Sequence, residues 1–115
     1  MNTRSQRLAR AAFARINARK PDKEFSGFAK AFPALIHACG LAQAVAFALA
    51  KKRNAYLDDL TEVLKAGGHS GINSPVELRR MACELHVPAY LRLSRDAINA
   101  ASWLKRYVEA FGEGD

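Results

Sequence analysis

The fifteen-residue stretch CGLAQAVAFALAKKR (residues 39–53) decides the fold, because eleven uncharged residues from Gly40 to Ala50 run directly into three cations. Such a stretch is typical of a membrane anchor with a basic stop, a buried helix, or a platform that presents charge to a nucleic acid. A spanning helix needs roughly 20 consecutive apolar residues. The run that begins at Leu41 holds only ten residues and includes Gln43. We therefore expect a helix buried in the core of its own domain and followed by a small cationic cluster.

The whole chain has the size and composition of one compact domain spanning residues 1–115. Its 115 residues are half hydrophobic and one quarter charged, close to the average of globular proteins. Only two cysteines are present, and the basic N-terminus lacks the continuous apolar segment of a signal peptide. These features predict a protein of the reducing cytoplasm without a membrane segment.

Apolar residues recur at helical spacing along nearly the whole chain, and no stretch shows the alternation of a strand. Pro21 ends the first helix, Gly40 is placed for a C-cap or a close backbone approach, and Ser74 with Glu77 suggests a capping box. Pro33 must kink the second helix or begin its second half. The spacing predicts helices at residues 3–20, 22–39 (or 26–39), 41–50, 54–65, 75–85 and 87–111 (or 88–111). We expect an all-α, single-domain compact bundle of about five to six helices with no sheet.

Four potential zinc ligands, His37, Cys39, Cys83 and His86, lack the spacing of a structural zinc site. Cys83 and His86 share one face only if their helix continues through His86, and His37 and Cys39 are splayed by about 200° around a helix. Ordinary histidines and buried thiols are the expected interpretation, and a disulfide is not expected in a reducing compartment. No metal or other cofactor is predicted.

The acidic residues do not suggest catalysis. Asp58 and Asp59 are sequence neighbours that point in different directions on a helix, which makes them a poor acid–base pair. The glycine-rich loop at residues 66–75 lacks the residue order of a phosphate-binding loop. We predict that the protein is not an enzyme and has no catalytic residues.

Positive charge is the strongest functional signal of the sequence. The net charge is +7 and the isoelectric point about 9.9, with eleven arginines and seven lysines. Such a surplus favours a polyanionic partner, and the planar guanidinium of arginine suits phosphate in particular. The alternative is that the charge serves solubility alone. The cations that could contact RNA lie on the first helix, after residue 50 and on the last helix: Arg4, Arg7, Arg10, Lys51, Lys52, Arg53, Arg92, Arg95 and Arg106.

A stripe on the last helix has the clearest pattern. Its members can all donate hydrogen bonds, and they recur at spacings of three and four: Arg92, Arg95, Asn99, Ser102 and Arg106. The opposite, core-facing side holds Tyr90, Leu93, Ala97, Ala101, Leu104, Val108 and Phe111. A donor-only stripe matches a phosphate backbone and carries no base code, although an ordinary polar face has the same pattern. Exposed aromatic residues for base stacking are not evident, which argues against a sequence-reading binder of single strands.

A basic N-terminal helix is followed by three motifs in order along the chain: FPALIHAC (residues 32–39), GLAQAVAF (residues 40–47) and AASWLKRYVEAF (residues 100–111). Together they resemble the small subunit of the type III-B CRISPR effector, the Cmr complex. The resemblance implies a non-catalytic helical protein whose copies stack beside larger backbone subunits and help hold crRNA and target RNA, while RNA cleavage belongs to the backbone subunits. It implies fold roles for Gly40, Leu41, Gln43, Phe47, Trp103 and Leu104, and charge available for partners at Lys105 and Arg106.

Copies that line an extended RNA need two complementary surfaces for a head-to-tail contact. Asp58, Asp59 and Glu62, which we expect to face water, form the only dense negative patch of the sequence. The basic face of the next copy is expected at Arg4, Arg7 and Arg10, or at Arg79 and Arg80. Two alternatives stay open: a free-standing basic architectural protein that binds nucleic acid, and a small adaptor whose charge is incidental.

Overall fold

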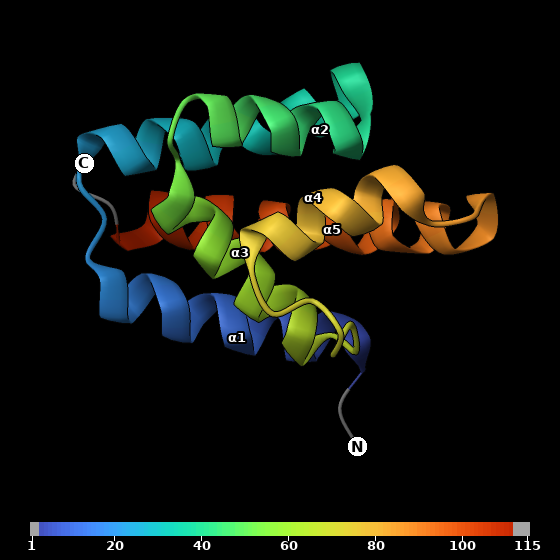
Figure 1. The fold of residues 1–115 in the computed structure, drawn as a ribbon. Coiled ribbons are helices and arrows are strands. Elements are labelled where there is room, and N and C mark those ends of the chain that lie inside the picture. The colour runs from blue at the N-terminus through green and yellow to red at the C-terminus, as the bar shows by residue number, and fades with distance from the viewer. Residues whose placement is uncertain (1–2, 112–115) are drawn as a thin grey trace.

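Five helices make up the computed structural model, which describes residues 3–111 (Figure 1). They are α1 (Arg4–Arg19), α2 (Lys23–Ala50), α3 (Asn54–Ala66), α4 (Pro75–Glu84) and α5 (Val87–Phe111). No strand occurs within residues 3–111. The expected all-α bundle is therefore confirmed.

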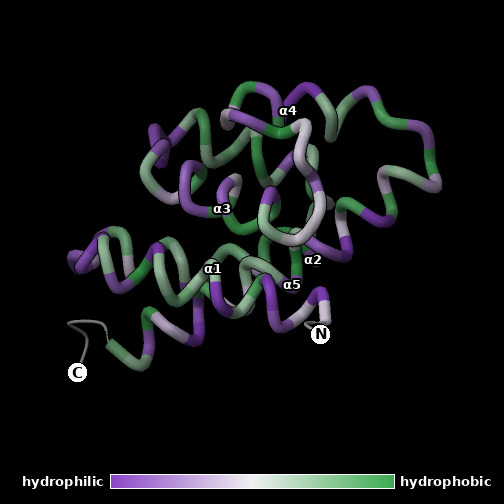
Figure 2. The backbone as a smooth tube through the Cα atoms, turned by 90° about the horizontal axis from the view of Figure 1, so that it is seen from below, coloured by the Kyte–Doolittle hydropathy of each residue, from purple (hydrophilic) through white to green (hydrophobic). Residues whose placement is uncertain are grey.

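Helices α3 and α5 each pack against all four of the other helices. The buried apolar residues of α5 are Leu93, Ala97, Ala100, Ala101, Leu104 and Val108, much as the sequence spacing predicts. Hydrophilic and hydrophobic residues alternate along much of the chain (Figure 2). An amphipathic helix of this kind can turn an apolar stripe to the shared core and leave a polar side in water.

Helix α2 consists of two arms that run in opposite directions on either side of Gly40 (Figure 1). Gly40 has φ 85° and ψ 161°, a backbone region that is essentially restricted to glycine. Pro33 lies within the first arm without leaving helical angles, so the chain breaks at the glycine and not at the proline. By length and composition α2 is long and apolar enough to cross a membrane. Its break leaves arms of residues 23–39 and 41–50, each shorter than the roughly 20 residues that a straight span needs.

The second arm of α2 is not buried all round, and this expectation from the sequence is wrong. Leu41, Ala44, Val45 and Ala48 are buried, whereas Gln43, Ala46 and Phe47 are exposed. The buried positions form one stripe at helical spacing, because the neighbouring helices cover only that side. An alanine-rich helix without charge can therefore lie at the surface of a bundle.

The helix ends are fixed by side chains close in sequence. Thr3 and Gln6 form a capping box at α1, and the Asp22 carboxylate accepts a hydrogen bond from the Phe25 N–H at 2.8 Å. Ser74 caps α4 by accepting from the Glu77 N–H. The expected reciprocal bond of that box is absent there, because the Glu77 carboxylate accepts from the N–H of Asn73 instead.

Replacing Gly40 by alanine should destabilise the protein by about 1–3 kcal/mol, because alanine rarely adopts the backbone angles of this position. Gly27 offers a matched control in the first arm of the same helix, where a new methyl group would meet no atom within 4 Å. Gly27→Ala should stabilise the fold by about 0.5–1 kcal/mol. Urea unfolding of both variants gives the two changes in free energy, and equal effects would contradict the assigned break at Gly40.

Candidate RNA and subunit surfaces

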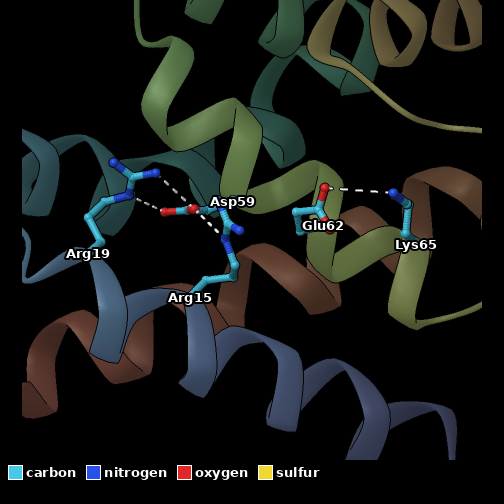
Figure 3. Close-up of polar contacts among 5 residues, drawn as sticks. All are labelled: Arg15, Arg19, Asp59, Glu62 and Lys65. Carbon is cyan, nitrogen blue, oxygen red and sulfur yellow. Dashed lines mark hydrogen bonds and ion pairs between the residues drawn. The ribbon is translucent and has the colours of Figure 1, made fainter.

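A buried carboxylate, Asp59 of α3, is held by two arginines of α1 (Figure 3). Arg15 donates its Nε–H to Oδ1 at 2.7 Å, and Arg19 donates Nε–H to Oδ2 and Nη2–H to Oδ1. The bonds to Asp59 raise the pKa of Arg19 above its ordinary value, although its partial burial lowers it. The expectation that Asp59 faces water is therefore wrong, because this side of α3 packs on α1.

The predicted negative patch is not assembled as a surface. Asp58 is exposed, but Glu62 is half-buried and its carboxylate lies 3.7 Å from the ammonium group of Lys65 (Figure 3). On the proposed opposite face, Arg79 and Arg80 are both exposed, and Arg80 pairs with Glu84 at 3.3 Å. With Asp59 buried, the two remaining acids offer a much weaker complement to a basic face than the sequence suggested.

Tyr56 lies beside Asp59 at the centre of an aromatic cluster. Its ring centroid is 5.0–5.9 Å from those of Phe25, Phe28 and Phe32. The hydroxyl is buried and has no hydrogen-bond partner within residues 3–111. Burial, with a smaller contribution from the charge of Asp59, raises the pKa of Tyr56 well above its usual range.

Asp96 of α5 is a second buried acid, and it accepts hydrogen bonds from two distant parts of the chain. The Arg4 Nη1–H lies 3.3 Å from Oδ2, and the His69 Nε2 lies 2.7 Å from the same oxygen. Arg4, a candidate for RNA contact, is thus tied to the fold although half of its side chain is exposed. No local sequence pattern indicates the contact between His69 and Asp96, because 27 residues separate the two.

The other candidate cations differ in how far they are engaged. Arg53 donates from Nη1 to Glu24 at 3.0 Å, and Lys51 lies over the ring of Phe47. Arg7 and Lys105 are half-buried. The exposed ones, which make no hydrogen bond or ion pair through their side chains within residues 3–111, are Arg10, Lys52, Arg92, Arg95 and Arg106. The arginines of the α5 stripe are thus the largest set of unengaged cations on one helix.

A partly exposed aromatic surface, contrary to the expectation that exposed aromatic residues are not evident, runs along α1 and α5. Trp103, Tyr107 and Phe111 stack at successive centroid distances of 5.8 and 5.9 Å, and Phe13 meets the last two edge-on. Phe13 is 44% exposed and Phe111, expected to face the core, is 46% exposed. The spacing of four between the α5 rings is visible in the sequence, but their pairing with Phe13 across two helices is not.

The candidate zinc ligands remain scattered. No group of three or more His, Cys, Asp or Glu side chains in the described part of the chain could hold a metal ion. Cys39 is half-buried and its thiol donates to the carbonyl of Leu35, whereas Cys83 is exposed, so the expectation of a buried thiol is wrong for Cys83.

Comparison with known proteins agrees with this helical arrangement. The family model for CRISPR-associated protein (Cas_Cmr5) matches residues 4–111. The chain belongs to the Cmr5 family. A curated relative from Thermus thermophilus, the CRISPR system Cmr subunit Cmr5, is 33% identical over 98% of this chain and 99% of its own length. The crystal structure of a Cmr5 family protein from the same organism superposes with a TM-score of 0.86 at 32% identity, covering 97% of this chain and 100% of that one.

Membership of the Cmr5 family confirms the resemblance carried by the three sequence motifs. Gly40 forms the break in α2, and Leu41 and Leu104 are buried in the core. Trp103 is half-buried, whereas Gln43 and Phe47 are exposed. The fold therefore does not depend on burial of those two residues.

Tyr56→Phe should leave stability at pH 7 unchanged or raise it, because the lost hydroxyl has no partner among the described residues. The wild-type protein should become less stable above about pH 10, where an unfolded tyrosine releases its proton and the folded Tyr56 retains it. The limiting slope is about 1.4 kcal/mol per pH unit, and Tyr56→Phe should remove this contribution.

Urea unfolding between pH 8 and 11 measures that slope. Tyr107→Phe, which removes a half-buried phenol from the aromatic surface, is the control. An alkaline loss of the same size in wild type and Tyr56→Phe would show that burial of Tyr56 is not its cause.

Proposed function

We propose that the protein is a non-catalytic structural subunit of a type III-B CRISPR effector, stacked beside the backbone subunits and contacting crRNA and target RNA. The observation that carries this proposal is the full-length match to a relative named as a Cmr subunit. That name describes a component of a complex, which favours an assembled role over a free-standing architectural protein or an adaptor with incidental charge. A role on RNA in the cytoplasm is in keeping with the two free cysteines and the basic surface.

The absence of catalysis is supported by the way the fold uses its buried acids. Asp59 is held by two guanidinium groups, and Asp96 by Arg4 and His69. Both carboxylates thus serve to join helices of the core. A general base needs a carboxylate or imidazole within reach of a substrate proton, and neither acid is arranged for that task.

RNA contact is assigned to the arginine stripe of α5. Arg92, Arg95 and Arg106 are exposed on one rigid helix, and their guanidinium groups make no hydrogen bond or ion pair within residues 3–111. From residue 92 to residue 106 the helix rises by roughly 21 Å, so the stripe can follow several phosphates. Phosphate contacts position a strand without reading its bases. Lys105 adds charge beside the stripe, with Arg10 and Lys51 as further exposed cations of the surface.

Replacing Arg92, Arg95 and Arg106 together by alanine should weaken RNA binding by the assembled complex without unfolding the domain. If three single-strand phosphate contacts are lost, the slope of log affinity against log salt should shrink by roughly 2, at about 0.7 per contact. Two RNA sequences of equal length should be affected equally.

The control for that variant removes the same charge elsewhere, through Lys23→Ala, Lys30→Ala and Arg79→Ala, all of which are exposed. Affinities are measured over a range of salt concentrations in complexes of equal copy number. An unchanged slope for the α5 variant would contradict RNA contact by the stripe.

Protein contact is assigned to the aromatic surface of Phe13, Trp103, Tyr107 and Phe111. Exposed apolar patches of soluble proteins commonly mark protein-interaction sites. Neighbouring rings on this surface are only 5.5–5.9 Å apart by centroid and already contact each other, which favours a protein over inserted bases. Asp58, Arg79 and Arg80 stay exposed and could form rim pairs, each worth about 0–1 kcal/mol.

Phe13→Ser should lower incorporation of the subunit into reconstituted complexes by about 30-fold in affinity, as expected for a hot spot of about 2 kcal/mol. Phe47→Ser is the matched control, because Phe47 has the same 44% exposure but lies on α2 outside the aromatic surface. Native mass spectrometry counts the copies, and thermal melting verifies that both variants fold. Equal loading of the two variants would show that the aromatic surface is not the contact.

A further inference from the structure

A cavity of about 300 Å³ lies between the end of α1, the start of α2 and the start of α3. The two loops that connect α2 to α1 and to α3 meet there. The walls of the cavity include Arg19 and Lys20 at the end of α1, and Lys52 and Arg53 between α2 and α3. Phe25 and Phe28 of α2 also line it. The volume is at the lower end of the range for small-molecule sites, which suits one small ligand or one unit of a polymer.

The charge of this cavity is positive. Four cations line it against two acids, Asp22 and Glu24. The Asp22 carboxylate already accepts the Phe25 N–H as a helix cap. Glu24 is 71% exposed and its one ion pair within residues 3–111 is with Arg53, so this pair contributes little and is easily exchanged.

Two guanidinium groups are stacked on aromatic rings in the cavity wall. The Cζ of Arg19 lies 5.2 Å from the ring centroid of Phe25, and the Cζ of Arg53 lies 5.6 Å from that of Phe28. Arg19 also donates two hydrogen bonds to Asp59, which hold its guanidinium group in a fixed position in the cavity wall. Planar guanidinium groups held in this way are platforms on which nucleic-acid bases stack.

Arg53 also has bonding capacity left over. It donates from Nη1 to the exposed Glu24, and its side chain keeps 29% of its surface exposed although its Nε is buried. Because the pair with Glu24 is easily exchanged, a phosphate group could accept from the terminal N–H groups of this guanidinium instead.

The two lysines of the cavity have an unusual backbone. Lys20 has φ 52° and Lys52 has φ 58°, and within residues 3–111 no other residue apart from glycine has a positive φ. Lys20 directly follows α1 and Lys52 lies two residues after α2, where helices usually place glycine. Both exceptions to that rule are lysines that line the same cavity.

We propose that this cavity binds one nucleotide of a single-stranded RNA. The phosphate is held by Lys20, Lys52 and Arg53, and the base stacks on the guanidinium–phenyl platforms. The inference rests on the proposed RNA-binding function and extends it, because a seated base would fix the position of the strand, whereas the α5 stripe contacts phosphates alone.

The test compares the full-length variant Lys20→Gly/Lys52→Gly with the charge-matched control Lys23→Ala/Lys30→Ala, which removes two exposed lysines outside the cavity. Glycine accepts positive φ, so the first variant should melt at the wild-type temperature or above. Its affinity for a ten-nucleotide single-stranded RNA should nevertheless fall about tenfold. Its salt slope should shrink by about 1.4, at 0.7 for each of two contacts. The control should lose less than about threefold.

A third variant tests whether an RNA base stacks in the cavity. Arg53→Lys keeps the charge and removes the planar guanidinium. An RNA with abasic sites should bind the wild-type protein more weakly than intact RNA, and this difference should shrink in Arg53→Lys.

Several results would overturn the inference. Equal losses of affinity in the glycine variant and the control would leave the two lysines as helix caps only. Wild-type binding of an acidic peptide of equal charge as tightly as RNA would assign the cavity to a protein segment. Failure of the isolated wild-type chain to bind RNA would also overturn the cavity assignment, whereas the proposed function is tested separately in the assembled complex.

Discussion

The buried charge of Asp59 is the constraint on which the rest of the structure depends. A lone carboxylate in the core would be strongly unfavourable, so α3 can pack on α1 only with Arg15 and Arg19 in place. Both arginines keep part of their side chains in water, which lowers the desolvation cost of the cluster. Removing one partner of a buried pair typically costs about 3–5 kcal/mol. The same cluster fixes Arg19 on Phe25 and thereby shapes one wall of the cavity.

Internal pairing changes the meaning of the formal charge of +7. Arg4, Arg15 and Arg19 direct guanidinium groups at two buried acids, so these charges join helices rather than attract partners. The exposed cations whose side chains make no hydrogen bond or ion pair among the described residues include Arg92, Arg95 and Arg106 on α5, and Lys20 and Lys52 just after α1 and α2. Net charge therefore indicates a class of partner only in outline, because the location of the unengaged charge, and not its sum, decides which surface can meet a phosphate chain.

Local sequence patterns were sufficient for the helices and for the break at Gly40, because caps, prolines and apolar spacing act within a few residues. The burial of Asp59 was also within reach: it lies three residues after buried Tyr56 and four before buried Val63, on the same helix face. Carboxylates are rarely buried unless paired, and the sequence shows no local partner for Asp59. The partners of Asp59 lie 40 and 44 residues away in the sequence. The contacts of Phe13 with Tyr107 and of His69 with Asp96 likewise join distant parts of the chain. Pairings of that kind depend on how the helices pack, and periodicity carries no information about them.

The lysines that end α1 and α2 show how a fold can leave a side chain available for binding. A left-handed backbone costs a residue with a Cβ atom about 1–2 kcal/mol relative to glycine. Two effects oppose this cost: a cation near the C-terminus of a helix gains about 0.3–1 kcal/mol, and glycine loses about 0.5–1 kcal/mol more entropy on folding. The sum is close to zero, so stability hardly distinguishes lysine from glycine at Lys20 and Lys52. At such positions, the choice between the two residues can follow what the ammonium group binds.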